Sequence, residues 1–141
     1  MIQVLVAPIS SSPLVVAFFE IYLFPDNDAL YSPEFLCTDG VKAAIRRREV
    51  LIAIADNRII GAIRFYRKKK QNIVSLYQFA IAEGYRGQGL LKQMLKAINE
   101  ISIEVLCPIS SSFNNYYHKT GWKLLQNSEK FNRWNLQLGS N

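Results

Sequence analysis

The chain has 141 residues, of which 50% are hydrophobic and 20% are charged, and its formal net charge is +6. These values indicate one globular domain over residues 1–141 and exclude a disordered tail. No apolar run approaches the roughly 18 residues of a membrane-spanning helix, and no basic segment precedes the short apolar stretch 14–19, so we expect neither a transmembrane helix nor a signal peptide.

The first third of the chain predicts a strand and two helices. The strand is expected over residues 2–7. The two serines and the proline of 11–13 are typical of a helix start, with serine as the cap, and an apolar run continues this helix to about Phe24. A loop rich in Asp, Asn, Ser and Pro, residues 25–33, separates it from a second helix that is expected over 39–48.

Three β-forming stretches come next, at 50–55, 59–66 and 73–82. A turn at 56–58 joins the first two, and a basic run ending in 71–72 joins the second to the third. Because both connections are short, the pattern predicts an antiparallel meander.

The pattern changes after the third of these strands. Apolar residues recur at helical spacing over 90–98, and a strand is expected over 101–106. One helix between two strands favours a parallel crossover. A short helix is expected over 110–119, ended by Gly121. Two last strands are expected at 122–125 and 131–138. The fold class is therefore α+β, with a mixed, mostly antiparallel sheet, a central parallel β-α-β unit and flanking helices.

The stretch EGYRGQGLLKQML, residues 83–95, has the parts of an anion site. A helix start offers unpaired backbone N–H groups and the positive end of a dipole. Gly87 and Gly89 remove side chains that would keep a phosphate away, and Arg86 adds a charged donor. We expect a phosphate or pyrophosphate on the amides of 86–91, although a glycine pair before a helix is also a common tight turn. No Gly-Lys-Ser/Thr follows, and the glycine spacing is not that of a dinucleotide fingerprint.

A second pattern, NNYYHKTGW, spans residues 114–122. If this segment is helical, Asn114 and Tyr117 lie on one face. A tyrosine hydroxyl there could donate a proton to a leaving group. The ordinary alternative is an aromatic side chain that packs on the core.

Together the two patterns resemble the GNAT superfamily of acyl-CoA N-acyltransferases. The resemblance rests on FAIAEGYRGQG at 79–89, on RGQGLL at 86–91 and on YYHKTGW at 116–122. It implies that the third meander strand and its parallel neighbour splay apart, and that the pantetheine arm of acetyl-CoA pairs there with backbone groups. It also implies that the loop amides hold the pyrophosphate and that an amine attacks the thioester directly.

The resemblance implies roles for residues that match the family motifs. Tyr117 would be the general acid for the departing thiolate. The residues expected to bind acetyl-CoA are Phe79, Ala80, Ile81, Ala82, Arg86, Gly87, Gln88, Gly89, Leu90, Leu91 and Asn114. Leu91 departs from the Gly or Ala that the family prefers, so its side chain must point away from the pyrophosphate. Ser75 stands where some members have a basic glutamate, which leaves the general base open between a water chain and a group from residues 25–40.

The leading hypothesis is thus an N-acetyltransferase that acts on a primary amine of a small molecule or peptide. A non-catalytic acyl-CoA-binding or regulatory domain is the second hypothesis. A nucleic-acid-binding module is the third, because basic residues cluster at Lys42, Arg46, Arg47 and Arg48 and at Arg64, Arg67, Lys68, Lys69 and Lys70. The alternative for both clusters is a solvated charged face.

The remaining expectations concern metals, location and partners. Cys37 and Cys107 show neither metal-ligand spacing nor a disulfide framework, so we expect no metal and a reduced, cytoplasmic environment. No membrane partner is expected and nucleic acid is an unfavoured partner. A homodimer is possible, because dimers are common among the proteins that the chain resembles.

Overall fold

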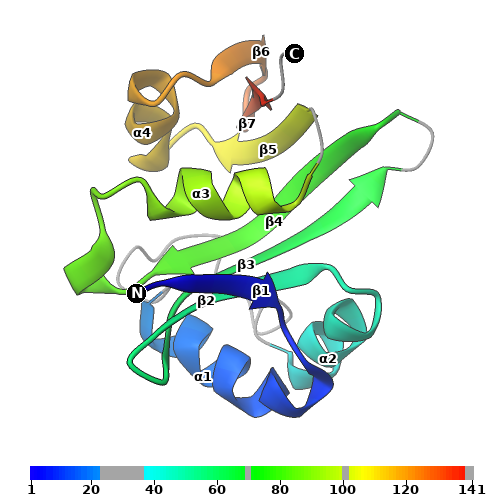
Figure 1. The fold of residues 1–141 in the computed structure, drawn as a ribbon. Helices are drawn as coiled ribbons and strands as arrows, with labels where there is room; N and C mark the ends of the chain where they lie inside the picture. Colours follow the sequence, from blue (N-terminus) through cyan, green and yellow to red (C-terminus); the bar gives the residue numbers. More distant parts are fainter. Residues whose placement is uncertain (23–36, 69–70, 100–101, 139–141) are drawn as a thin grey trace. The chain divides into compact units, whose positions relative to one another are not determined.

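The structure is a computed structural model that describes residues 1–22, 37–68, 71–99 and 102–138 (Figure 1). The strands are β1 (Gln3–Val6), β2 (Val50–Ala55), β3 (Arg58–Lys68), β4 (Ile73–Ile81), β5 (Ser102–Pro108), β6 (Lys123–Asn127) and β7 (Phe131–Gln137). The helices are α1 (Ser12–Tyr22), α2 (Thr38–Arg46), α3 (Leu90–Ala97) and α4 (Phe113–Lys119), with short 3-10 turns η1 (Ile9–Ser11) and η4 (Glu83–Tyr85).

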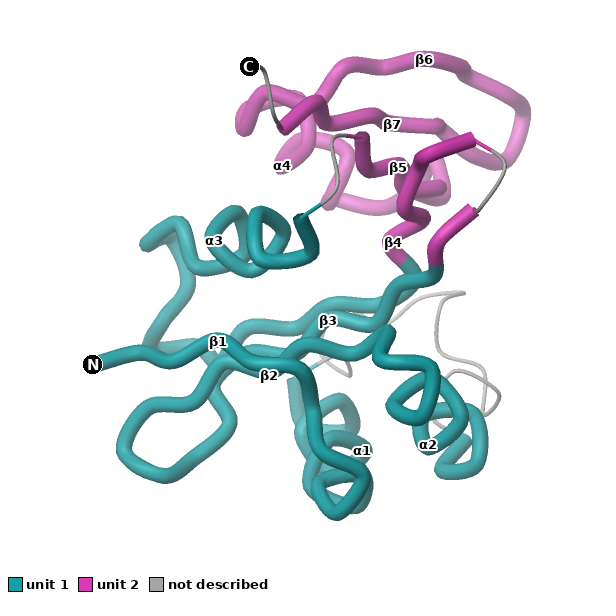
Figure 2. The backbone as a smooth tube through the Cα atoms, turned by 45° about the vertical axis from the view of Figure 1, so that its right-hand side comes forward, with its two compact units in different colours: residues 1–66, 77–99 teal, residues 67–76, 100–141 magenta. Residues whose placement is uncertain are grey.

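The hydrogen-bonded strand order is β1-β2-β3-β4-β5-β7-β6. β4 and β5 form a parallel pair, and the pairs β1–β2, β2–β3, β5–β7 and β6–β7 are antiparallel, so the predicted mixed α+β sheet is confirmed. The chain divides into two compact units, which Figure 2 colours separately. Unit 1 comprises Met1–Tyr66 and Tyr77–Asn99, and unit 2 comprises Arg67–Leu76 and Glu100–Asn141. One domain over residues 1–141 stays a prediction.

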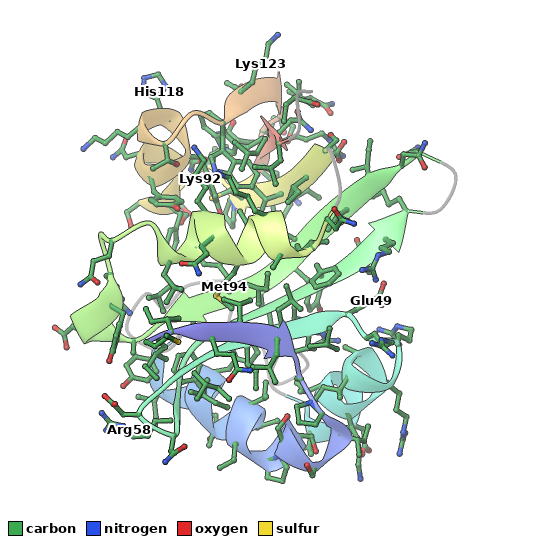
Figure 3. All side chains as sticks on the ribbon, viewed as in Figure 1. Glu49, Arg58, Lys92, Met94, His118 and Lys123 are labelled. Carbon is green, nitrogen blue, oxygen red and sulfur yellow. The ribbon has the colours of Figure 1, made fainter. Side chains whose placement is uncertain are left out.

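Unit 1 is a three-layer arrangement. α1 and α2 cover one face of β1–β3, and α3 covers the other (Figure 1). Five of the six side chains of β2 are buried, as expected for a continuous apolar strand with helices on both faces. Phe19 of α1, Val41 of α2 and Met94 of α3 are fully buried. Met94 points from α3 toward the sheet (Figure 3).

The helices of unit 1 begin and end slightly differently from the prediction. η1 leads directly into α1, and the Ser11 hydroxyl donates to the Pro8 carbonyl at 2.6 Å, so Ser11 closes this turn and does not cap α1. α2 ends at Arg46, two residues early. Arg48 adopts a left-handed φ of 62°, and the N–H of the next residue, Glu49, bonds back to the Ala44 carbonyl, which stops the helix. The predicted end of α1 at Phe24 and the loop 25–33 lie outside the described residues.

The turn between β2 and β3 is confirmed. Asp56 and Asn57 have φ values of 52° and 63°, the positive pair that a two-residue type I′ hairpin requires. β3 extends two residues past the predicted end at 66. Its last residue, Lys68, pairs with Glu104, and this contact favours continuation of the strand.

Unit 2 packs β5 against β7, with β6 beyond it. The predicted strand 101–106 runs instead over Ser102–Pro108, because β7 pairs with it as far as the Pro108–Phe131 partners. α4 starts three residues later than predicted, at Phe113, and its predicted end at Gly121 is confirmed by a φ of 93°.

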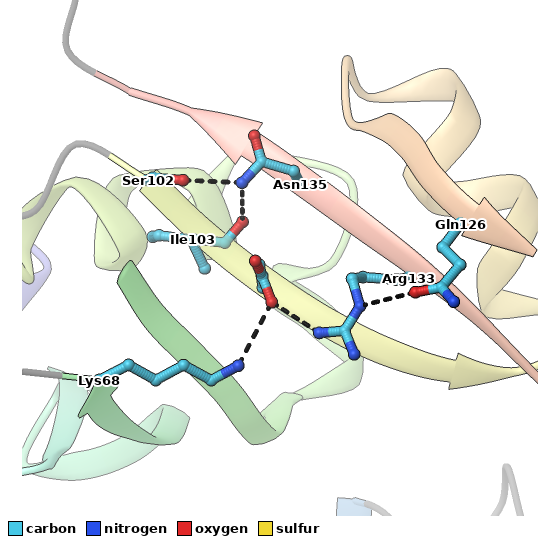
Figure 4. Close-up of polar contacts among 7 residues, drawn as sticks. Lys68, Ser102, Ile103, Gln126, Arg133 and Asn135 are labelled. Carbon is cyan, nitrogen blue, oxygen red and sulfur yellow. Dashed lines mark hydrogen bonds and ion pairs between the residues drawn. The ribbon is translucent and has the colours of Figure 1, made fainter. Parts of the chain in front are cut away.

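A polar network stabilises unit 2 (Figure 4). The Glu104 carboxylate, in a residue only 8% exposed, accepts from Arg133 Nη1 at 2.8 Å and from Lys68 Nζ at 3.4 Å. Asn135 donates to the Ser102 hydroxyl and to the Ile103 carbonyl. A buried carboxylate with two cationic partners is compensated, so Glu104 serves the structure of β5.

Candidate active site

The predicted site residues fall into two groups, one in each unit. The end of β4 and the following loop, residues 79–91, belong to unit 1, whereas Asn114 and Tyr117 belong to unit 2. Each group has its own geometry and is described in turn.

The end of β4 orients its backbone groups in two directions. The Ala82 N–H donates to the Ile60 carbonyl of β3 at 2.8 Å. Since N–H and C=O groups of successive strand residues alternate between the two edges, Ala80 and Ala82 face β3, and Phe79 and Ile81 face the opposite edge. The Ile81 carbonyl accepts from Arg86 Nε at 2.9 Å, which agrees with this orientation.

The loop after β4 is held by its own side chains. Arg86 fastens the loop to the strand through Ile81, and the Gln88 amide donates to the Gly84 carbonyl at 3.1 Å. Gly87 and Gly89 have φ values of 76° and 79°, a left-handed conformation that side chains rarely adopt. The sequence therefore needs glycine at both positions for the backbone to turn into α3.

The start of α3 presents several backbone donors. The first N–H with a helical partner is that of Gln93, which bonds to the Gly89 carbonyl, so the N–H groups of Leu90, Leu91 and Lys92 have no partner within the helix. The Arg86 N–H already bonds to the Glu83 carbonyl at 3.3 Å. The backbone donors that remain for the predicted anion site thus begin after Arg86.

The side chains of Leu90 and Leu91 turn into the core, as the prediction that Leu91 points away from the pyrophosphate requires. Their side chains are 4% and 6% exposed, so they lie in the core and leave only their amides at the helix start. Residues 86–89 are exposed. Leu91 therefore places no side chain over the loop.

Tyr117 lies in an aromatic cluster of unit 2. Its ring centroid is 5.0 Å from that of Trp122 and 5.9 Å from that of Trp134, and the residue is 2% exposed. Burial, and to a smaller extent Cys107 and Tyr116, raise the pKa of its hydroxyl well above the usual value. The phenol is therefore protonated at neutral pH, which is the state that a proton donor needs.

Asn114 has a different environment from the one predicted. Its amide nitrogen donates to the Pro108 carbonyl at 2.8 Å and to the Ser111 carbonyl at 3.0 Å. Its oxygen accepts from Asn132 Nδ2 at 3.0 Å and from Trp134 Nε1 at 2.9 Å. Two donors and two acceptor positions exhaust a carboxamide, so no capacity remains for a pantetheine contact. Asn114 instead joins the start of α4 to β7 and orients Trp134 beside Tyr117.

Trp134 is a neighbour of Tyr117 that the sequence did not predict. Its only signal was an aromatic residue at a buried position of the last strand.

Cys107 is buried, as expected for a structural thiol, and His118 is exposed and points outward from α4 (Figure 3). In the ranges that the structure describes, no group of three or more His, Cys, Asp or Glu residues could hold a metal ion.

Some residues of the two basic clusters form ion pairs within the protein. Arg47 pairs with Glu49 at 2.7 Å, and Lys68 pairs with Glu104. Arg64 is half-buried, and Lys69 and Lys70 lie outside the described residues. These contacts favour a structural reading of the clusters over a nucleic-acid surface.

The loop geometry and the strand order define an acyl-CoA-binding fold, and a family model bears this out. The model of the Acetyltransferase (GNAT) domain matches residues 29–137. The chain belongs to the GNAT acetyltransferase family and is an acetyl-CoA-dependent acyltransferase, with acetyl-CoA as cosubstrate. A sequence comparison with curated proteins finds no match.

Solved structures share this fold at low sequence identity. The PaiA N-acetyltransferase of Thermoplasma acidophilum, in complex with coenzyme A, has a TM-score of 0.79 and 16% identity over 98% of this chain and 99% of that one. The polyamine N-acetyltransferase of Drosophila melanogaster, which forms N-acetylagmatine, has a TM-score of 0.74 and 10% identity over 98% and 100%. The N-acetylglutamate synthase of Neisseria gonorrhoeae, complexed with coenzyme A and N-acetyl-glutamate, has a TM-score of 0.73 and 12% identity over 99% of this chain and 36% of that one.

Across the described parts of the chain, no helix combines the length and the apolarity needed to cross a membrane.

Proposed function

We propose that the protein transfers the acetyl group of acetyl-CoA to a primary amine by direct attack in a ternary complex. The observation that carries this proposal is the loop of unit 1, in which two left-handed glycines deliver exposed backbone donors at the start of α3. Family membership supplies the acyl-CoA chemistry. The primary amine and the order of the reaction are our inference.

The cosubstrate contacts follow from the geometry of unit 1. The amides of Gly87 to Leu91 bind the pyrophosphate, because the helix dipole and the unpaired N–H groups favour an anion there. Arg86 has further guanidinium donors besides Nε and adds positive charge. The edge of β4 that Phe79 and Ile81 face pairs with the pantetheine arm, and Ala80 and Ala82, which face β3, support that edge.

Tyr117 is the proposed general acid. The amine nitrogen forms a bond to the acetyl carbonyl carbon, the C–S bond breaks, and the tyrosine hydroxyl gives its proton to the sulfur. A phenol with a raised pKa is a weak acid in water. Burial raises the pKa of a thiolate in the same way, however, so the two groups remain matched for proton transfer. Asn114 acts as a positioning residue through Trp134.

The attack of the amine also needs a proton acceptor. The attacking amine must be neutral, and its proton must leave after the bond forms. Ser75 offers no carboxylate, and Glu104 is held by Arg133 and Lys68. Glu83 lies next to the phosphate loop and is a poor candidate. A water chain, or a group from residues 25–40, of which 25–36 lie outside the described residues, is the proposed proton acceptor.

Proteins of this fold differ in their acceptors, so the fold does not identify the acceptor of this chain. One similar structure is a polyamine acetyltransferase and another is an N-acetylglutamate synthase, so their acceptors carry opposite charges. We propose a small molecule or a peptide with a primary amine. A cytoplasmic location and a homodimer stay predictions, for which fractionation and light scattering are the measurements.

The function is tested by the release of free thiol from acetyl-CoA in the presence of a panel of primary amines. We expect release that depends on both the protein and the amine, with one acetylated amine formed per thiol, as measured by mass spectrometry. Stoichiometric acetyl-CoA binding with no amine-dependent release from any member of the panel would favour the non-catalytic alternative. Tight binding to duplex DNA with a steep salt dependence would favour the third hypothesis.

A further inference from the structure

Arg64 of β3 is a half-buried cation on the face of unit 1 that α2 covers. Its Nη1 donates to Gln78 Oε1 at 3.3 Å, a long hydrogen bond to a neutral group. Its Cζ lies 4.6 Å from the ring centroid of Tyr77, and its Nη2 lies 3.4 Å from where a Cβ on Gly40 would be. The guanidinium therefore lies against the Tyr77 ring and close to the backbone of α2. Loss of solvent on burial is the main cause that lowers the pKa of Arg64.

No counter-ion balances this charge among the residues that the structure describes. Among the described residues, Arg47–Glu49, Lys68–Glu104 and Arg133–Glu104 form ion pairs, and none of these includes Arg64. Glu49 is close enough to act on Arg64 electrostatically, but its carboxylate is held by Arg47 at 2.7 Å. Among the described residues, the charged groups that act on Arg64 are thus Arg47 and Glu49, and Cys37 and Tyr77 are the other titratable groups that do so.

A partly desolvated cation without a counter-ion is costly and attracts an anion. A guanidinium has five donors in a planar fork that matches a carboxylate. Within the part of the chain that the structure describes, the hydrogen bond to Gln78 engages one of them. The cluster also reaches the surface. Tyr77 is 39% exposed and Tyr66 is 42% exposed, and their ring centroids are 6.3 Å apart. A ligand can therefore approach along two aromatic faces.

The position along β4 connects this cation to the proposed chemistry. Tyr77 precedes Phe79 by two residues, a rise of roughly 7 Å along a strand. Phe79 begins the stretch that we assign to the pantetheine arm. An amine that carries a carboxylate a few bonds away could place one group at Arg64 and the other near this edge.

We propose that Arg64 binds a carboxylate of the acceptor, so that the acceptor class is an α-amino acid or a short peptide with a free carboxylate. This inference rests on the proposed function and narrows its substrate. A polyamine is disfavoured, because a second ammonium group beside Arg64 and Arg47 would be repelled. The carboxylate of the bound acceptor accepts two parallel hydrogen bonds from the guanidinium. The side chain of the acceptor packs on Tyr77.

The test uses matched pairs of probes with acetyl-CoA and the full chain. L-methionine is compared with L-methioninamide, L-phenylalanine with L-phenylalaninamide and the dipeptide Gly-Gly with its amide, and spermidine is added as a polyamine. A charged hydrogen bond contributes about 1.5–3 kcal/mol. We therefore expect kcat/KM for at least one acid to exceed that of its amide by about 10- to 150-fold, with most of the difference in KM.

Three variants make the test specific. Arg64→Gln should abolish the preference for the acid, because kcat/KM for the acid should fall to the level of the amide. Arg64→Lys should restore part of the preference, because it returns the charge without the fork. Arg58→Gln is the control, since it removes an exposed arginine at the other end of β3 (Figure 3) and should change neither rate. Thermal unfolding confirms that each variant is folded.

Calorimetric titration with acetyl-CoA distinguishes a failure of the proposed function from a failure of the inference about Arg64. If the parent protein does not bind acetyl-CoA, the proposed function fails. If it binds acetyl-CoA, the inference about Arg64 is overturned by equal rates for acids and amides, by a preference for spermidine, by acetylation of none of the probes, or by an Arg64→Gln variant that keeps the acid preference. A lost preference with unchanged acetyl-CoA affinity supports it.

Discussion

The loop of unit 1 and the aromatic cluster of unit 2 present opposite kinds of functional group. The loop is exposed, and its chemistry is that of backbone amides whose direction is set by the φ angles of Gly87 and Gly89. The cluster is buried, and its chemistry is that of one phenol, Tyr117, fixed by Trp122 and Trp134. A substitution should therefore act through backbone conformation in the loop and through side-chain chemistry or packing in the cluster.

The largest expected effect is on turnover. Tyr117→Phe removes the proposed proton donor and keeps the ring, so kcat should fall by about 10²- to 10⁴-fold while KM for acetyl-CoA stays nearly constant. Steady-state thiol release measures both constants. Tyr116→Phe is the matched control, because its ring is on another face of α4 and is half-exposed. Full activity in Tyr117→Phe, or damage confined to Tyr116→Phe, would show that the second motif is wrongly aligned.

The next effect concerns ligand-linked stability. A ligand that binds only the folded protein raises the free energy of unfolding by about 2.7 kcal/mol at 100 times its Kd. CoA and acetyl-CoA should both raise Tm in proportion to the logarithm of their concentration, and adenosine alone should raise it much less. Differential scanning fluorimetry gives the result directly. An unchanged Tm at millimolar CoA is incompatible with the loop assignment.

Asn114 sharpens the comparison, because it matches a family position yet serves the packing of unit 2. Asn114→Ala leaves the Trp134 indole N–H and two backbone carbonyls without this partner. The free energy of unfolding should fall by about 1–3 kcal/mol, as measured by urea denaturation. Asn115→Ala, exposed on the same helix, should be almost neutral. Calorimetry should give the same acetyl-CoA Kd for Asn114→Ala as for the parent; a much weaker Kd in a folded variant would restore the direct pantetheine contact.

The smallest effect is expected from a change of backbone conformation. Gly89→Val places a β-branched residue at a φ of 79°, which costs about 1–2 kcal/mol. Binding of acetyl-CoA would have to restore this backbone conformation against that cost. The Kd for acetyl-CoA should rise by roughly 5- to 30-fold. Gly84→Ala is the control, since a Cβ there meets nothing within 4 Å and its φ is not in the left-handed region. An equal Kd for both folded variants would argue against an anion site at these amides.

Periodicity and turn chemistry predicted most of the fold. The three central strands, the parallel crossover and the glycine-bearing loop all carry local signals, such as the Asp56–Asn57 turn and the apolar spacing of α3. The ends of elements were less predictable, because tertiary contacts set them. β3 extends to Lys68 through its pairing with Glu104, and α2 stops where Arg48 turns left-handed, and neither event has a local signature.

The candidate site was likewise predictable from the sequence only in part. The glycines are visible in the sequence because only glycine tolerates their φ angles, so the loop could be located. The occupied amide of Asn114 and the neighbour Trp134 could not be foreseen, since their contacts join residues 20 positions apart in the chain. The half-buried surroundings of Arg64 likewise depend on strands and a helix that meet only in the fold.

The claim that the loop amides of unit 1 hold the pyrophosphate of acetyl-CoA is tested most directly by one calorimetric comparison. The parent protein is titrated with acetyl-CoA and with S-acetyl-pantetheine, which keeps the thioester and the arm but lacks the pyrophosphate and the nucleotide. We predict saturable binding of one acetyl-CoA per chain and binding of S-acetyl-pantetheine that is weaker by at least about 100-fold, in line with the loss of two or more charge-assisted hydrogen bonds. Equal affinity for the two ligands, or no binding of acetyl-CoA, would contradict the account.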